Sequence, residues 1–174
     1  MIQTARLRLV PLELHHYPEV FQLWSRYEVI RFTYSTLLQT PEECRERLAG
    51  WLPQYSDPDG ANKFAIFREN EFIGIIGFPM FRREELTCGF FYQIVPEFWG
   101  NGYASEAAAG MLAFLLERHP NVTVIADAVE ANPASIRILQ KLGFVQTMRE
   151  EKGFQNNGME LDILHFRLER KETT

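Results

Sequence analysis

Apolar and polar positions follow two periods along this chain, and turn residues separate the segments. Alternation predicts half-buried strands, whereas apolar residues three and four apart predict helices packed on a core. The pattern predicts strands over residues 6–10, 63–68, 72–81, 87–95, 122–129, 144–148 and 159–168, and helices over 18–27, 40–52, from 103 onward and over 133–142. The resulting order β, α, α, β, β, β, α, β, α, β, β indicates a mixed α/β fold.

Two of the predicted helices have clear start signals. Thr40 can cap the second helix, and Pro41 occupies the first helical position, where its missing N–H costs nothing. Asn132 and Pro133 repeat this arrangement at the start of the last helix, and Gly143 marks its end. In that last helix the residue after Ala134 is Ser135, which shares a face with apolar residues and is predicted to point inward.

A strand, a glycine turn and a helix follow one another in the segment 92–106. Gly100 and Gly102 form the turn, and the helix is predicted to open at about Tyr103. Unpaired backbone amides at such a helix start, together with the helix dipole, suit a phosphate or pyrophosphate. Ser105 stands where a dinucleotide-binding fingerprint needs its third glycine, and no Gly-Lys-Ser/Thr sequence of a nucleoside-triphosphate loop follows.

Composition narrows the class of protein further. The chain of 174 residues is predicted to form one domain, 1–174, and 46% of its residues are apolar. A formal charge of −5 argues against a nucleic-acid partner and mildly favours a cationic one. Two cysteines, Cys44 and Cys88, form no disulfide framework, and no signal-like or membrane-length apolar run occurs. A cytoplasmic protein without a membrane partner is expected.

Three other segments carry weaker signals. The irregular stretch 30–38 contains Phe32 and Tyr34 and either lines a substrate pocket or forms a packed loop. The apolar phase of the final strand shifts between Ile163 and Leu164, which predicts a bulge there. His15 and His16 are adjacent and point apart, so no metal site is expected.

The ordered motifs resemble the GNAT superfamily of N-acetyltransferases. The resemblance rests on Pro-Glu-Phe-Trp-Gly-Asn-Gly-Tyr-Ala-Ser-Glu-Ala (96–107), Asn-Pro-Ala-Ser (132–135) and Gly-Phe (143–144) in their strand and helix setting. Thr-Ala-Arg-Leu-Arg-Leu (4–9) is similar to the opening of the ribosomal-protein N-terminal acetyltransferase branch. The resemblance implies a mostly antiparallel sheet of about seven strands, about four flanking helices and a splay between the fourth and fifth strands.

The resemblance also implies acetyl-CoA as co-substrate, without a metal. Its pyrophosphate would lie on the turn and helix start, and its pantetheine arm would pair with the strand before the turn. The implied cofactor residues are Ile94, Val95, Phe98, Gly100, Asn101, Gly102, Tyr103, Ala104 and Asn132. Acceptors consistent with the resemblance are a small amine or a peptide N-terminus, with Phe32, Tyr34 and Tyr92 as candidate substrate contacts. A homodimer is retained as an alternative to a monomer.

Catalytic candidates follow from the same comparison. Many members carry a tyrosine acid where this chain has Leu139, so Ser135 is the candidate for protonating the departing thiolate. Asp127 is the candidate general base, and a solvated or salt-bridged aspartate is the competing interpretation. Gly89 and Phe91 replace a glutamate and a glycine often found ahead of the turn. A non-catalytic acyl-CoA-binding module therefore stays as the alternative, whereas the predicted antiparallel meander excludes a nucleotide-binding α/β domain.

Overall fold

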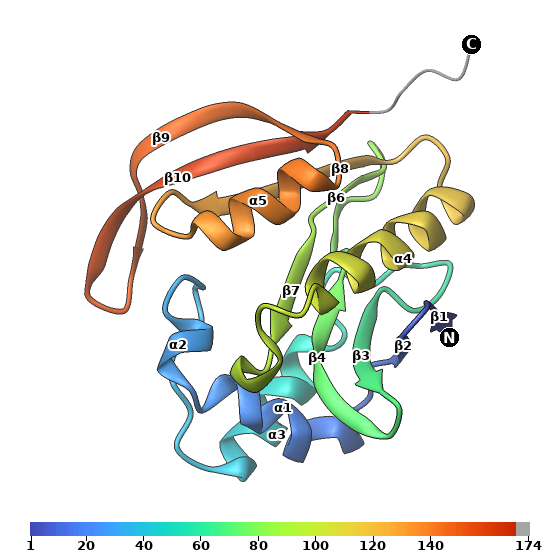
Figure 1. Ribbon diagram of the computed structural model, residues 1–174, viewed down its shortest axis with the longest axis vertical. Coiled ribbons are helices and arrows are strands. Elements are labelled where there is room, and N and C mark those ends of the chain that lie inside the picture. Colours follow the sequence, from blue (N-terminus) through green and yellow to red (C-terminus); the bar gives the residue numbers. More distant parts are fainter. Residues whose placement is uncertain (170–174) are drawn as a thin grey trace.

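The computed structural model describes residues 1–169, which form two five-stranded sheets flanked by helices (Figure 1). The first sheet has the order β1 (Ile2–Gln3), β2 (Leu7–Pro11), β3 (Lys63–Arg68), β4 (Glu71–Gly77) and β7 (Phe91–Ile94). The second has the order β5 (Met80–Arg82), β6 (Thr87–Cys88), β8 (Thr123–Val129), β10 (Met159–Leu168) and β9 (Phe144–Asn156). The helices are α1 (Tyr17–Trp24), α2 (Tyr27–Ile30), α3 (Pro41–Trp51), α4 (Tyr103–Arg118) and α5 (Pro133–Lys141), with 3-10 turns η1 (Leu14–His16) and η2 (Pro96–Phe98).

The expected mixed α/β fold with a splayed sheet is confirmed. Strands β7 and β8 belong to different sheets and share no ladder, while β6, which precedes β7 in the chain, pairs in parallel with β8. The last β6–β8 pair is Cys88–Val124, and within a few residues of it β7 and β8 separate into the two sheets. The strand count is higher than expected because β1 is added and two predicted strands are each divided. The expected domain 1–174 includes residues 170–174, which lie outside the described part of the chain.

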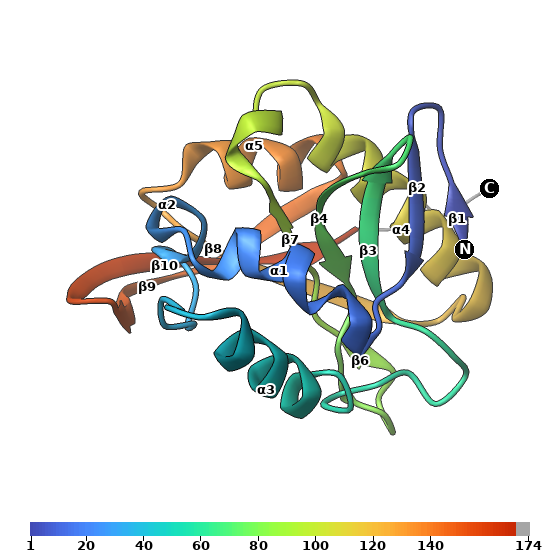
Figure 2. The same cartoon turned by 90° about the horizontal axis from the view of Figure 1, so that it is seen from below.

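The first sheet is covered on both faces. Ile66 in β3 packs in a core with Ala108 and Met111 of α4, whereas its neighbour Ala65 packs with Leu23 of α1 and Leu48 of α3. Successive strand residues point to opposite faces, so this alternation places α4 opposite α1 and α3 (Figure 2). Within residues 1–169, none of the helices has the length and apolar character needed to cross a membrane.

Predicted helix starts agree with the structure. Thr40 and Glu43 form the expected capping box, and the Asn132 side chain caps α5 by accepting the Ser135 amide. Gly143 follows the end of α5 with a φ of +91°. The predicted helix over 18–27 instead ends at Trp24, and α2 follows as a separate short helix.

Three strand predictions need correction. The predicted strand 72–81 is broken before Met80, because Pro79 has no N–H to continue the ladder. The predicted strand 87–95 is interrupted at Gly89 and Phe90, where the chain passes from the second sheet to the first. Strand β9 continues to residue 156, well past the predicted end at 148. The bulge predicted between residues 163 and 164 is wrong, because register shifts fall on either side, between 161 and 163 and between 165 and 166.

Lys63 is a buried lysine whose ammonium binds only backbone oxygens and an aromatic ring in the described structure. Its side chain is buried, and Nζ donates to the carbonyls of Leu52 at 3.0 Å and Gln54 at 2.6 Å, just beyond α3. Nζ also lies 5.4 Å from the ring centroid of Trp51. Burial lowers the pKa of Lys63 to about 8. The folded protein therefore binds this proton less tightly than the unfolded chain does.

We expect a pH dependence of stability that belongs to Lys63. Since the folded pKa lies below the unfolded value, the unfolded chain binds more protons between about pH 8 and 10.5, and the free energy of unfolding rises with pH there. Urea denaturation of the parent relative to Lys63→Met should show a gain of about 2 kcal/mol from pH 7.5 to 9.5. Equal pH slopes for the two proteins would contradict the assignment.

Candidate functional site

The glycine turn and the start of α4 form a cradle of backbone amides. Gly100 and Gly102 both have a φ of +77°, a left-handed conformation that glycine adopts without strain. The Asn101 amide group braces the turn by donating to the carbonyls of Phe98 at 3.2 Å and Trp99 at 3.0 Å. Helix α4 begins at Tyr103, and its first turn leaves amides without intrahelical acceptors. The geometry therefore suits an anion, as predicted.

Two arginines beside the cradle were not identified from the sequence. Arg6 donates from Nη1 to the Asn101 carbonyl at 3.1 Å, and its guanidinium lies 4.5 Å from the ring centroid of Tyr103. Arg68 lies over the ring of Phe98, 5.2 Å from its centroid, and Nη1 donates to the Tyr103 hydroxyl at 3.4 Å. Both side chains add positive charge next to the amides. Arg6 lies immediately before β2 and Arg68 is the last residue of β3, so neither is close to the turn in the sequence.

The turn also contains carboxylates, and each has a basic partner. Glu97, the acid at the first turn position, receives a bond from Arg26 Nη1 at 2.6 Å, and this hydrogen bond is the main cause that lowers the pKa of Glu97. Glu106 in the first turn of α4 binds Arg6 Nε at 2.6 Å. Burial would raise the pKa of Glu106, but hydrogen bonds from Thr4 and Arg6 outweigh it and lower that pKa. Neither acid is left to repel an anion unopposed.

Strand β7 presents alternate backbone groups to the splay. The Val95 amide donates to the Ile73 carbonyl at 2.8 Å, so the amide and carbonyl of Ile94 point away from β4, toward β8. The Val95 carbonyl accepts the Phe98 amide at 2.9 Å, so the Val95 amide and one lone pair of its carbonyl are already engaged. The expected cofactor contacts of Ile94 and Val95 stay predictions, and the Ile94 backbone is the one directed into the splay. Its carbonyl accepts the indole N–H of Trp99 at 2.7 Å, and Trp99 is a half-exposed residue that sequence reasoning did not select.

Ser135 and Tyr92 meet across the splay. The Tyr92 hydroxyl donates to Ser135 Oγ at 3.2 Å, which joins β7 to the first turn of α5. Asn132 Oδ1 accepts the Ser135 amide at 3.3 Å and so fixes the backbone that carries the serine. Burial raises the pKa of Tyr92, and the bond to Ser135 only partly opposes this, so the phenol stays protonated and acts as a donor. The structure thus places Tyr92 with the predicted acid.

Asp127 lies on the other face of β8. Its neighbours Ala126 and Ala128 pack in the core beside α4, so Asp127 points to the opposite side. Its Oδ1 lies 2.6 Å from Nδ1 of His165, and Nε2 of His165 lies 3.0 Å from a Glu150 oxygen. Asp127 is therefore ion-paired, as the competing interpretation held, and its role as base stays a prediction.

The carboxylates of this cluster favour the protonated form of His165. Burial alone would lower the pKa of His165, but the hydrogen bond to Glu150 and the charge of Asp127 outweigh it and raise that pKa. The imidazole therefore retains its proton to higher pH than an ordinary histidine does. This face of β8 therefore presents two carboxylates, Asp127 and Glu150, with the imidazole of His165 between them.

The two candidate substrate residues of the irregular stretch lie near that cluster. Tyr34 is exposed, and its ring lies 5.1 Å from that of Phe154. Burial, followed by the charges of Asp127 and Glu150, raises the pKa of Tyr34, which places the phenol within their field. Phe32 packs against a small core that contains Val129 on the Asp127 face of β8. The structure thus brings Phe32, Tyr34 and Asp127 to one face and Tyr92 and Ser135 to the other.

Comparisons with known proteins agree with this geometry. A family model described as an acetyltransferase (GNAT) domain matches residues 6–145. An uncharacterized N-acetyltransferase, YoaA of Bacillus subtilis, is 27% identical over 146 residues, which cover 83% of this chain and 82% of that protein. FsC-acetyl coenzyme A-N(2)-transacetylase of Aspergillus fumigatus is 26% identical over 182 residues, which cover 98% of this chain and 77% of that protein.

A solved structure shares the fold. The ribosomal L7/L12 alpha-N-protein acetyltransferase RimL in complex with coenzyme A superposes with a TM-score of 0.83. The alignment covers 94% of each chain at 18% sequence identity, so it is evidence for the fold and not for the acceptor. The splay, the glycine turn and the motif-bearing helices of this chain therefore belong to an architecture that also occurs in that enzyme.

Proposed function

The chain belongs to the GNAT family of acetyltransferases, and from this premise we propose that it transfers an acetyl group from acetyl-CoA to a primary amine by direct attack in a ternary complex. It is an N-acetyltransferase, and acetyl-CoA is the co-substrate that the family uses. The observation that carries the detailed proposal is the Tyr92–Ser135 pair, which meets at the open edge of β7 beside the amide cradle.

The residues present fit acetyl-CoA. Left-handed glycines, free amides at the start of α4 and the nearby Arg6 supply what a pyrophosphate needs without a metal. The Ile94 backbone, directed into the splay, is available to an extended amide chain such as pantetheine once the Trp99 indole moves from the Ile94 carbonyl. Bound in this way, acetyl-CoA supplies an activated acetyl group and a thiolate leaving group at the centre of the molecule.

With acetyl-CoA bound, each polar group at the splay has a role in the transfer. The Tyr92 hydroxyl donates to Ser135 Oγ, so the serine proton is free to point toward the departing thiolate. The Ile94 amide is the backbone donor closest in sequence to the turn that can stabilise the developing oxyanion. The remaining rate enhancement comes from holding the amine against the thioester carbonyl, because this positions the two reacting groups.

The amine enters from the face that carries Asp127. Phe32 and Tyr34 flank this approach, and the cluster of Asp127, His165 and Glu150 attracts an ammonium group. The ammonium proton leaves to Asp127 or to solvent before attack. A small amine and a protein N-terminus both satisfy this arrangement, and the fold shared with a ribosomal-protein enzyme supports testing the latter.

A thiol-release assay tests the proposal. Acetyl-CoA would be incubated with the protein and with a panel of alkylamines, amino acids and peptides with free N-termini, and the same peptides with blocked N-termini serve as controls. We expect thiol release that depends on a free primary amine and a mass gain of one acetyl group on that amine. Coenzyme A binding without release for any acceptor would favour the non-catalytic acyl-CoA-binding module.

A further inference from the structure

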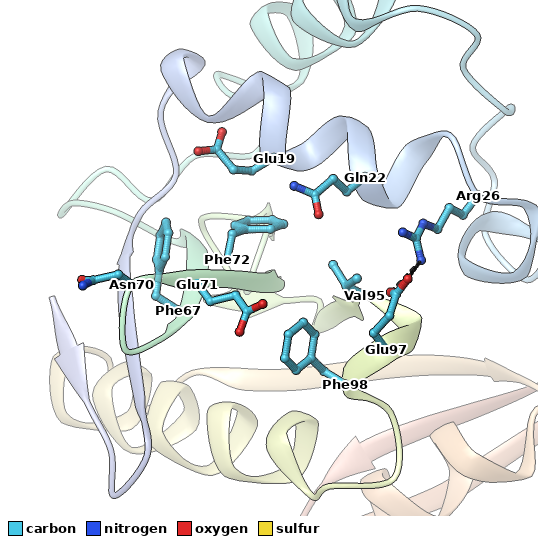
Figure 3. Close-up of a pocket in the computed structure, with 10 residues that line it drawn as sticks. All are labelled: Glu19, Gln22, Arg26, Phe67, Asn70, Glu71, Phe72, Val95, Glu97 and Phe98. Carbon is cyan, nitrogen blue, oxygen red and sulfur yellow. Dashed lines mark hydrogen bonds and ion pairs between the residues drawn. The ribbon is translucent and has the colours of Figure 1, made fainter.

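A cavity lies away from the splay. It has a volume of about 370 Å³ and opens between α1, the turn of the β3–β4 hairpin and the segment that ends β7 (Figure 3). In the first sheet, β4 and the hairpin lie on one side of the edge strand β7, whereas Tyr92 of β7 contacts Ser135 across its other side, at the splay. The cavity is therefore separate from the place where Tyr92 and Ser135 meet. Its volume falls within the range of small-molecule sites.

The floor of this cavity is apolar and largely aromatic. Phe67 and Phe72 come from the hairpin, and Val95 and Phe98 come from the end of β7 and from η2. Figure 3 shows Phe72 beneath α1, between Phe67 and Val95. The Phe67 and Phe72 rings pack edge to face at 5.8 Å, which fixes their orientation. Such a floor favours an alkyl chain, and aromatic faces also attract cations.

The rim is acidic. It contains the carboxylates of Glu19, Glu71 and Glu97 and a single guanidinium, that of Arg26. Arg26 is engaged with Glu97 at 2.6 Å, and Glu71 binds Arg68 at 3.0 Å. Glu19 has no such basic partner among the ion pairs of residues 1–169. The uncompensated negative charge of the cavity is therefore concentrated at Glu19.

Glu19 also contains an unsatisfied polar atom. Its Oε2 is buried, and no donor within the described residues reaches it. A buried acceptor without a partner is unfavourable, so such atoms in native structures usually have a water, an ion or a ligand as their partner. Gln22 lies about one helical turn after Glu19 on α1 and also lines the cavity, and Figure 3 shows its side-chain amide directed toward that cavity.

We propose that this cavity is a binding site for a small alkylammonium ion, separate from the acceptor amine of the transfer reaction. The ammonium group donates to the Glu19 carboxylate, the Gln22 amide oxygen accepts a second of its protons, and the alkyl chain lies on Phe67 and Phe72. A divalent metal ion fits less well, because it needs several oxygen ligands and only one carboxylate is unpaired here. An anion is excluded by the charge of the rim.

Ligand titration by NMR tests this site directly. The probe is n-butylammonium, and n-butanol is the neutral control of equal chain length, both titrated in the absence of acetyl-CoA. We expect the parent protein to bind the ammonium and not the alcohol. Glu19→Gln should weaken ammonium binding at least tenfold, because it removes the charge and keeps the shape. Glu46→Gln, the same change at an exposed residue of α3, should leave the affinity unchanged.

A second variant keeps the test decisive if Glu19→Gln folds poorly. Gln22→Arg places a guanidinium three residues from Glu19 on the same helix face, where it can bind the carboxylate. We expect this variant to lose n-butylammonium binding and to melt no lower than the parent. Equal affinity in the parent, Glu19→Gln and Gln22→Arg would place the probe elsewhere and overturn the proposal, as would the absence of binding to the parent. Because no acetyl transfer is measured, these outcomes are independent of the proposed reaction.

Discussion

Replacing Ser135 by alanine is expected to lower the turnover number by about ten- to a hundredfold while leaving the affinity for acetyl-CoA nearly unchanged. A thiolate departs without help at a reduced rate, so a hydroxyl aimed at it accelerates the step without being indispensable. The loss appears in the turnover number alone because the hydroxyl acts in the transition state. Steady-state kinetics on a good acceptor, with calorimetry for coenzyme A binding, measures both quantities.

The Tyr92–Ser135 bond gives this experiment a sharper form. Tyr92→Phe keeps the ring and removes only the hydroxyl that donates to Ser135 Oγ at 3.2 Å. If Tyr92 acts through Ser135, the single tyrosine variant loses less activity than Ser135→Ala, and the double variant is no worse than Ser135→Ala. A thermal melt confirms that each protein is folded. Turnover of Ser135→Ala equal to that of the parent would remove Ser135 as the acid.

Gly102→Val should weaken coenzyme A binding by more than tenfold. The residue has a φ of +77°, which a β-branched side chain adopts only with strain, so the turn would shift and the amides would lose their common direction. A Cβ atom at this position would have only Arg6 Nη2 nearby, at 3.6 Å. The effect therefore comes from backbone conformation and from obstruction of the phosphate, not from a clash within the protein.

Gly158 provides the matched control. It has a φ of +74°, and a Cβ atom there would meet nothing within 4 Å. Gly158→Val thus introduces similar backbone strain in the β9–β10 turn, far along the chain from the cradle. Both variants should lose comparable stability in a thermal melt, and only Gly102→Val should lose affinity in calorimetry. Equal affinities for the two variants would remove the pyrophosphate from the glycine turn.

Much of the fold was predictable because its signals are local. The caps at Thr40 and Asn132 and the helix start at Tyr103 depend on residues within one turn of each other. The division of two predicted strands was not predicted, because the breaks depend on contacts with residues of other strands. At Gly89, a Cβ atom would come within 2.4 Å of the Phe81 ring, so the break depends on a neighbour from another strand.

The same distinction applies to the site. Ser135 and the glycine turn belong to sequence motifs, and the structure places both beside the splay. Arg6 reaches the turn through contacts with Asn101 and Glu106, about a hundred residues away, and no periodicity links such positions. Asp127 could be located on its strand from alternation, but its bond to His165 depends on the pairing of β8 with β10.

The separation between β7 and β8 also bears on how the molecule opens. Each sheet is held together by its own ladders. Next to the splay, the chain before β7 pairs with β8 only through β6, in the two residue pairs Thr87–Thr123 and Cys88–Val124. A hinge-like fluctuation at this line would leave the long ladders of both sheets intact, so its free-energy cost is a local one rather than that of global unfolding. The line between the two sheets thus coincides with the place where we propose that the thioester lies, so a local opening there would admit a substrate while the long ladders of both sheets stay intact.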